Sequence, residues 1–152
     1  MEYENTQRGG WHWLLVALAA VAMTVAWANR SLPNLPIVLS ATGVLFLVLS
    51  WTFGTLTIRD EGQWLAIRFG PLPLFFKRIR YADITSVEPG RTSIIDGWGM
   101  HYILGRGWTY NLWGFGCAKL TLGKKVIRVG SDDVDNLVAF LQSKIADNAS
   151  GS

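Results

Sequence analysis

The distribution of apolar and polar residues divides the chain into two parts with different periodicities. Residues 11–28 and 37–58 contain no Asp, Glu, Lys or Arg. At a rise of about 1.5 Å per residue, a run of about 20 apolar residues spans the ~30 Å hydrocarbon core of a bilayer. The pattern therefore predicts a hairpin of two transmembrane helices, residues 11–29 and 36–56, preceded by an N-terminal tail, residues 1–10.

Two alternatives are open for these apolar runs. Residues 26–28 (AWA) resemble a signal-peptide cleavage site and Arg8 lies upstream, but Glu2 and Glu4 remove the usual net positive charge and the run is long for a signal peptide. Buried helices of a soluble protein are the second alternative, although the runs lack the polar stripe of a half-exposed helix.

Charge and tryptophan positions predict the orientation of the hairpin. Trp11, Trp13 and Trp27 bracket the first run and Trp51 lies near the end of the second, as interfacial anchors do. The linker, residues 29–36, holds one basic residue, whereas basic residues are frequent after the second run. The positive-inside rule then predicts a multi-pass protein of a bacterial cytoplasmic (inner) membrane with both termini in the cytoplasm.

From Thr57 onward the periodicity changes to the alternation of β-strands. In residues 63–70, Leu65, Ile67 and Phe69 occupy one face, and an Arg-Asp-Glu-Gly turn precedes them, so 56–59 and 63–69 form a first predicted hairpin. Pro71 and Pro73 end the second strand. Further short strands are predicted near 75–80, 83–88, 99–104 and 107–112, from Cys117, and over 126–129.

The chain closes with an amphipathic helix. Ser131 is its predicted N-cap, and an apolar stripe follows at helical spacing: Val134, Leu137, Val138, Leu141 and Ile145. The last residues, 147–152, are polar and predicted to fray. The predicted fold of residues 57–146 is a mainly β barrel or sandwich of about seven short antiparallel strands, capped by this one C-terminal α-helix.

Several segments resemble the bacterial PH-like (pleckstrin-homology-like) domains of small membrane-anchored proteins, which are mostly of unassigned function. The matching segments are FGPLP (69–73), YADITSVE (81–88), GWGM (97–100), GWTYN (107–111) and GKKVIRVGSDD (123–133). The resemblance implies a PH-like cytoplasmic domain on a membrane tether. Lipid-binding PH domains cluster cations in their first hairpin, whereas residues 59–62 (RDEG) are net acidic, so no specific phosphoinositide is expected.

The chemistry of the sequence favours a protein without a cofactor or a catalytic site. No metal-ligand spacing surrounds His101, the single Cys117 suits a reducing compartment, and the glycines match neither dinucleotide nor Walker motifs. A net charge of +3 and the lack of an RNP-type signature argue against nucleic acid, despite the aromatic and basic mixture at 106–110. A less favoured alternative is an enzyme that uses Ser93, Asp96 and His101 as a triad.

Residues 96–116 (DGWGMHYILGRGWTYNLWGFG) are the predicted contact region for another protein. The segment has more large aromatic residues than a small core admits, so we expect some of Trp98, Trp108, Tyr110 and Trp113 to remain exposed and to bind a partner. The expected partner is another membrane protein or a second copy of the chain, and an Ala22-x3-Ala26 pair permits close helix approach. The predicted function is a membrane-tethered, non-catalytic binding or assembly module.

A cationic stretch supplies the alternative function. Lys77, Arg78 and Arg80 follow two phenylalanines, and cations near a membrane surface attract anionic lipid. Peripheral sensing of anionic lipid is therefore the second hypothesis. The same charges also protect an edge strand from aggregation.

Overall fold

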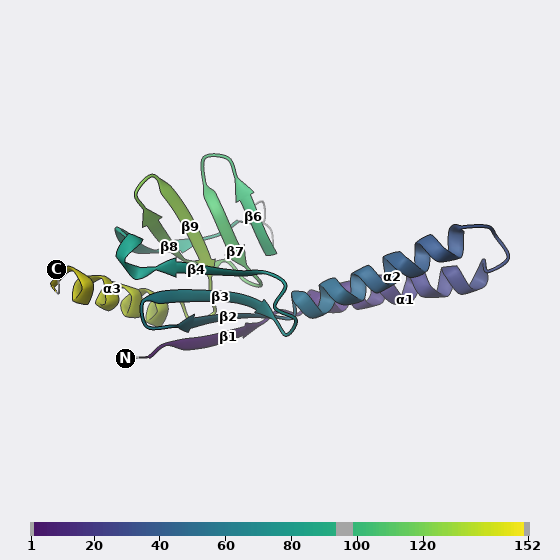
Figure 1. Ribbon diagram of the computed structural model, residues 1–152, viewed down its shortest axis with the longest axis horizontal. Helices are drawn as coiled ribbons and strands as arrows, with labels where there is room; N and C mark the ends of the chain where they lie inside the picture. The colour runs from purple at the N-terminus through teal and green to yellow at the C-terminus, as the bar shows by residue number, and fades with distance from the viewer. Residues whose placement is uncertain (1, 94–98, 151–152) are drawn as a thin grey trace.

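The computed structural model describes residues 2–93 and 99–150, which form a long helical hairpin and a β-rich body (Figure 1). The element order confirms a mainly β body that ends in one C-terminal helix. The elements are β1 (Glu4–Arg8), α1 (His12–Ala28), α2 (Leu35–Thr52), β2 (Thr55–Asp60), β3 (Trp64–Gly70), β4 (Phe76–Arg80), a 3-10 turn (Tyr81–Asp83), β5 (Ser86–Arg91), β6 (Gly99–Ile103), β7 (Gly107–Asn111), β8 (Gly116–Leu122), β9 (Lys125–Gly130) and α3 (Val134–Ser150).

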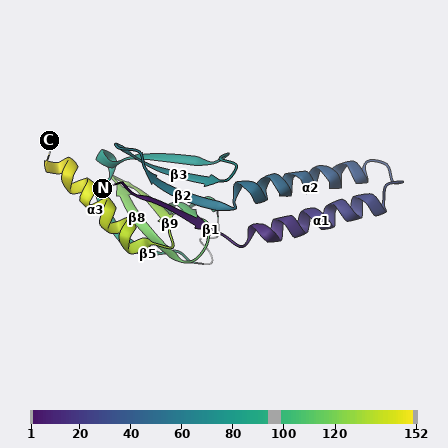
Figure 2. The same cartoon turned by 90° about the horizontal axis from the view of Figure 1, so that it is seen from below.

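The two apolar helices lie side by side and project from the body in both views (Figures 1 and 2). Ala19, Ala22 and Ala26 of α1 are buried together with Gly43 of α2, so small residues form the seam between the helices. A Cβ atom at Gly43 would lie 3.1 Å from Met23 Cγ and 3.3 Å from the Ala19 carbonyl oxygen. The predicted close approach at Ala22 and Ala26 is therefore made inside the hairpin.

One of the two helices is long and apolar enough to cross a membrane by length and composition. This helix is α2, with 18 residues and a mean hydropathy of 1.9, whereas α1 is equally free of charge but has 17 residues. The second helix ends at Thr52, earlier than the predicted residue 56. Phe53 leaves the helix to pack on Phe69 and Phe75, and Leu56 is already fully buried in the body.

Two sheets make up the body, in the strand orders β1-β2-β3-β4 and β5-β8-β9-β7-β6. Neighbouring strands are antiparallel except for β7 and β9, which pair in parallel from Trp108↔Ile127 to Tyr110↔Val129. The described residues thus hold nine strands where about seven were predicted, and the predicted antiparallel pairing is confirmed for every neighbouring pair except β7 and β9. Apolar side chains from both sheets and α3 form one core, which includes Ile67, Leu120 and Leu137.

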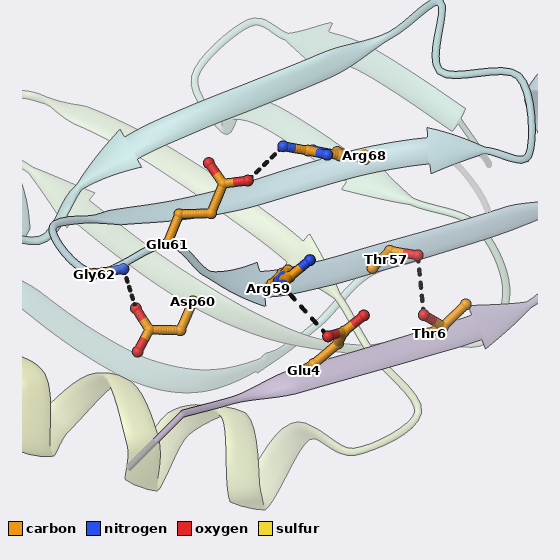
Figure 3. A network of polar contacts seen from close by, with 8 residues as sticks. All are labelled: Glu4, Thr6, Thr57, Arg59, Asp60, Glu61, Gly62 and Arg68. Atoms are coloured by element: carbon orange, nitrogen blue, oxygen red, sulfur yellow. Dashed lines mark hydrogen bonds and ion pairs between the residues drawn. The ribbon is translucent and has the colours of Figure 1, made fainter.

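The N-terminal segment, predicted to be a tail, is an edge strand of the first sheet. Thr6 and Thr57 share a hydrogen bond of 2.9 Å across β1 and β2, and Glu4 pairs with Arg59 at 3.6 Å (Figure 3). The polar sequence of β1 hides its role because these contacts lie on an exposed face. The strand leads directly into α1, so both ends of the hairpin continue into paired strands.

A buried polar cluster fixes α3 to the first sheet. The Asp60 carboxylate accepts hydrogen bonds from the Tyr81 hydroxyl (2.9 Å) and the Gly62 N–H (3.0 Å), and it pairs with Lys144 Nζ (2.8 Å). Burial, followed by the hydrogen bond to Asp60, raises the pKa of Tyr81 well above its usual range. The helix is held at the end of the body remote from the hairpin (Figures 1 and 2).

Both ends of α3 differ from the prediction. The Leu137 N–H donates to the Asp133 carbonyl at 3.1 Å, so Asp133 rather than Ser131 occupies the N-cap. Ser131 instead accepts the Asp133 N–H at 3.0 Å in the preceding turn. The helix continues through Ser150 where fraying was predicted from residue 147, and the Ile145 side chain still packs against the core.

Candidate functional site

The candidate site is a groove on the side of the body where the two sheets present their edges. Strand β4 is an edge of the first sheet and β6 an edge of the second. The opposite side is covered by α3: the rings of Tyr3 in the N-terminal segment and Phe140 stack at 5.2 Å, and Gln142 donates to the Val87 carbonyl in β5. The core is thus closed on one side and opens on the other into the groove.

Basic and aromatic side chains line this groove. It encloses a cavity of about 370 Å³ between β4, β6, β7 and β9. No Asp or Glu is among its lining residues. We call this feature the basic–aromatic groove; its charged and aromatic members are Lys77, Tyr102, Arg106, Trp108, Tyr110, Lys124 and Lys125.

The aromatic wall follows from the pairing of β6 with β7. Tyr102 lies directly opposite Trp108 across the two strands, and Tyr110 follows Trp108 on the same face of β7. The ring centroids are 5.6 Å apart for Tyr102 and Trp108, and 6.3 Å apart for Trp108 and Tyr110. Exposure rises along the row, from 5% at Tyr110 through 42% at Trp108 to 57% at Tyr102, so the rings lead from core to solvent.

One glycine allows β7 to approach β9 closely enough to form the wall. Gly107 has a φ of +85°, and a Cβ atom there would lie 2.1 Å from the Val126 carbonyl oxygen. Any other residue would be strained at this φ and would push the two strands apart.

Burial alone raises the pKa of Tyr110 at the inner end of the wall, so its phenol is neutral over the physiological range.

The cationic stretch of β4 is divided between two faces. Lys77 lies opposite buried Ile67 on the inner face and lines the groove. Arg78 and Arg80 belong to the outer face, where Arg78 Nε is 2.9 Å from Glu61 and the Arg80 guanidinium lies 5.5 Å from the centre of the Trp64 ring. The three predicted lipid contacts therefore do not form one patch.

The Glu61 carboxylate neutralises part of that outer face. It pairs with Arg68 across the first β-hairpin (Figure 3) as well as with Arg78. The side chains of both arginines are about half exposed, at 44% for Arg68 and 52% for Arg78. In contrast, Lys77, Lys124 and Lys125 form no ion pair within the described part of the chain, so the groove keeps its positive charge.

The remaining predicted contact residues lie elsewhere. Trp113 is 44% exposed in the loop between β7 and β8, where its carbonyl accepts a 2.7 Å hydrogen bond from Gln7, outside the groove. Trp98 falls outside the described residues. The structure thus brings Trp108 and Tyr110 together with Lys77, a combination of residues that the sequence assigned to two different functions.

The alternative triad is not assembled by the described residues. Asp96 lies outside them, and Ser93 follows β5. His101 is opposite Thr109 on β6 and β7, on the face that alternates with Tyr102 and Trp108, so it points away from the groove wall. Within residues 2–93 and 99–150, no group of three or more His, Cys, Asp or Glu residues is placed to hold a metal ion.

A second hollow, at the base of the helical hairpin, was not predicted. It encloses about 590 Å³ where β1 enters α1 and α2 leaves for β2. The sequence marks its rim with Trp13 and Trp51, but the hollow itself depends on the pairing of Arg8 with Thr55, which a polar N-terminal segment does not reveal. We call it the junction hollow, lined by Arg8, Gly9, Gly10, His12, Trp13, Ser50, Trp51, Gly54, Thr55 and Pro71.

Comparison of the sequence with known protein families and with curated proteins finds no match. The resemblance to PH-like domains therefore stays a prediction.

Proposed function

We propose that the chain is a membrane-anchored, non-catalytic binding module. In this proposal the helical hairpin is embedded in a bilayer and the β body, a PH-like domain, stands at the cytoplasmic surface. The basic–aromatic groove then binds an acidic segment of a second protein of the same membrane.

The observation that carries the anchor is the surface of the hairpin. Outside the seam between α1 and α2, large apolar side chains are exposed on all sides of the hairpin. Monomeric soluble proteins rarely expose contiguous apolar patches larger than a few hundred Å². In a bilayer the same apolar surface contacts lipid acyl chains, which are also apolar. The exposed side chains are Trp13, Leu14, Leu18, Val21, Val25, Trp27, Leu35, Ile37, Val38, Val44, Leu45, Leu47, Val48 and Trp51.

The dimensions of the hairpin fit two spans. At about 1.5 Å per residue, α1 and α2 are about 26 Å and about 27 Å long, close to a hydrocarbon core of ~30 Å. Exposed Trp13 and Trp51 lie at one end of the pair and Trp27 at the other, as interfacial anchors. Arg30 is the single charge of the connecting loop, which supports a loop outside and a body in the cytoplasm of a bacterial inner membrane.

Charge complementarity supports an acidic partner. The groove has cationic side chains from three separate segments, β4, the β6–β7 turn and the β8–β9 turn, around an aromatic wall. Exposed tyrosine and tryptophan are enriched where proteins bind one another, because they offer large apolar area with a polar edge. In Figure 1 the turns that join β6 to β7 and β8 to β9 point sideways, away from the hairpin axis, and these two turns supply Arg106 and Lys124 to the groove.

The same geometry weighs against anionic lipid as the ligand of β4. Strand β4 (Phe76–Arg80) begins near the hairpin in Figure 1 and runs away from it, roughly along the hairpin axis. At about 3.3 Å per residue, Arg80 lies about 13 Å beyond Phe76. That distance exceeds the Debye length of about 8 Å at physiological ionic strength, which leaves Arg80 little attraction to the membrane surface.

Photo-crosslinking in native membranes tests the binding site. A benzophenone amino acid is placed at Tyr102 in the groove or at Phe76, which is similarly exposed but on the outer face of the first sheet. We expect an adduct of defined mass from position 102 and none from position 76. Lys77→Glu combined with Lys124→Glu should abolish the adduct.

Five results would contradict the proposal. Adducts of equal yield from both positions, or an adduct that persists after both charge reversals, would remove the groove as the site. An adduct of twice the chain mass would identify a second copy as the partner instead. Release of the chain from membranes by alkaline carbonate would contradict the proposed membrane anchor. Activity outside the cytoplasm alone of a reporter fused after Ser152 would contradict its proposed orientation.

A further inference from the structure

We propose that the junction hollow binds the phosphate group of a glycerophospholipid headgroup. This inference rests on the proposed membrane anchor, because that anchor places the hollow at the depth of the headgroups. It is independent of what the basic–aromatic groove binds. Four observations support it: an open helix N-terminus, a buried hydroxyl with no partner, an arginine with no ion pair and a pair of flanking tryptophans.

The first turn of α1 offers backbone donors to the hollow. The N-cap residue Trp11 makes no side-chain capping bond, and no acidic residue lies in the first turn. Among the described residues, the N–H groups of Trp13 and Leu14 already donate to carbonyls, whereas those of Gly10, Trp11 and His12 have no acceptor. Free N–H groups at the start of a 17-residue helix attract an anion through their partial positive charge.

Ser50 provides the independent observation that points to a ligand. Ser50 belongs to α2, lines the hollow and is 1% exposed. Its hydroxyl has no hydrogen-bond partner within the described residues. The three threonine hydroxyls of the same two helices, those of Thr24, Thr42 and Thr52, all donate to the carbonyl four residues earlier. Ser50 departs from that pattern, and a phosphate oxygen in the hollow would accept its proton.

The charge of the hollow suits a phosphate. Arg8 is the one Lys or Arg among its lining residues, no Asp or Glu lines it, and Arg8 forms no ion pair within the described part of the chain. A guanidinium presents paired donors that match two oxygens of one phosphate group. His12 also lines the hollow, and its Nδ1 donates a 2.6 Å hydrogen bond to the Gly9 carbonyl.

The position of the hollow selects a lipid as the source of that phosphate. Trp13 and Trp51 form part of its wall and are 67% and 66% exposed, so they mark the level of the membrane interface in the proposed anchor. The phosphates of a bilayer lie at this level at high local concentration. Free phosphate carries the same chemistry, and the experiment below separates the two sources.

The test uses the purified full-length chain in neutral detergent micelles and counts bound molecules by native mass spectrometry. The probes are dioctanoyl phosphatidylglycerol, dioctanoylglycerol, which lacks the phosphate, and inorganic phosphate. We expect one retained phosphatidylglycerol and no retained dioctanoylglycerol. Arg8→Gln should weaken retention about tenfold or more, since it removes a charge-assisted hydrogen bond.

Two further variants separate binding from folding. Arg30→Gln removes the arginine at the opposite end of the hairpin and should leave retention unchanged. Ser50→Ala removes a hydroxyl that has no partner without lipid, so the thermal midpoint of the lipid-free chain should not fall, while the rise in that midpoint caused by phosphatidylglycerol should shrink.

Equal retention of dioctanoylglycerol, or equal losses for Arg8→Gln and Arg30→Gln, would overturn the inference. Inorganic phosphate that competes at concentrations similar to the lipid would show a free-phosphate site and overturn the choice of a lipid. A loss of thermal stability in lipid-free Ser50→Ala would assign the hydroxyl to the fold. Resistance to alkaline extraction, measured separately on wild-type membranes, distinguishes failure of this inference from failure of the proposed anchor.

Discussion

Replacing Lys144 by methionine is expected to loosen α3 from the β body. Lys144 Nζ lies 2.8 Å from the Asp60 carboxylate, whose side chain is only 5% exposed. Methionine keeps much of the aliphatic length but removes the ammonium group, which also lies 5.5 Å from the centres of the Tyr81 and Phe140 rings. The buried carboxylate then keeps two neutral donors, the Tyr81 hydroxyl and the Gly62 N–H, and loses its cation.

The size of the effect follows from this partial compensation. Breaking a buried ion pair by removing one partner costs about 3–5 kcal/mol when the other charge is left without compensation. Here two hydrogen bonds remain and the Lys144 side chain is 23% exposed, so part of its attraction is already screened by water. We therefore expect Lys144→Met to lower the free energy of unfolding by about 2–3 kcal/mol.

A double-mutant cycle in detergent micelles measures the pair directly. Guanidinium unfolding of the full chain, followed by tryptophan fluorescence, is compared for wild type, Lys144→Met, Asp60→Asn and the double variant. Because Asn still accepts from Tyr81 and needs no cation, the double variant should be more stable than the sum of the single losses implies, by about 1–2 kcal/mol. The matched control is Lys119→Met, which removes an exposed ion pair with Glu88 and should lower the free energy of unfolding by less than about 1 kcal/mol. Additive losses, or a cost for Lys144→Met no larger than that of the control, would refute the reasoning.

Two further predictions concern the groove wall and alkaline pH. Gly107→Ala should lower the free energy of unfolding by more than about 3 kcal/mol because the new Cβ atom would clash with the Val126 carbonyl oxygen. Gly105→Ala, at a similar positive φ but with no atom within 4 Å of its Cβ, should lower it by about 1–2 kcal/mol. Equal shifts of the denaturation midpoint for the two variants would contradict this. The pKa of Tyr81 is raised above its usual 10.0, first by burial, so the folded chain holds the phenolic proton more tightly than the unfolded chain. That contribution is complete below about pH 10 and is lost as pH rises further, so Tyr81→Phe should flatten the alkaline decline of the unfolding midpoint, and an unchanged slope would count against it.

The sequence predicted the elements whose signal is local. Alternation over 63–69 became β3, and the apolar stripe beginning at Val134 became α3, because in each case one face is buried in the core. Strand β1 was missed for the opposite reason: of Glu4–Arg8, one residue, Gln7, is buried, and the strand is stabilised by its pairing with β2. Such a strand depends on a partner about 50 residues away, so no local pattern reports it.

The groove was predicted only as separate pieces. Trp108 and Tyr110 are adjacent in the pattern of one strand, so their shared face was predictable. Lys77 lies near them because the inner faces of the two sheets meet across the core. Its strand β4 is an edge strand of the first sheet and β7 is an inner strand of the second, so their proximity depends on the tertiary structure. The parallel pairing of β7 with β9 also brings Lys124 and Lys125 to the same opening, and sequence alternation contains no information about strand direction.

The connection between hairpin and body bears on how the groove is presented. Both helices continue into neighbouring strands of one sheet, where Arg8 pairs with Thr55 and the Gly9 N–H donates to the Gly54 carbonyl at 3.2 Å. Phe53 packs at this point against Trp11 from the start of the hairpin, at 5.7 Å, and against Phe69 in β3, at 5.2 Å. A body attached by two paired strands and an aromatic cluster has little freedom to swing on its anchor. In the proposed bilayer anchor the groove is therefore held at a nearly constant height above the membrane, within reach of a second protein of the same membrane.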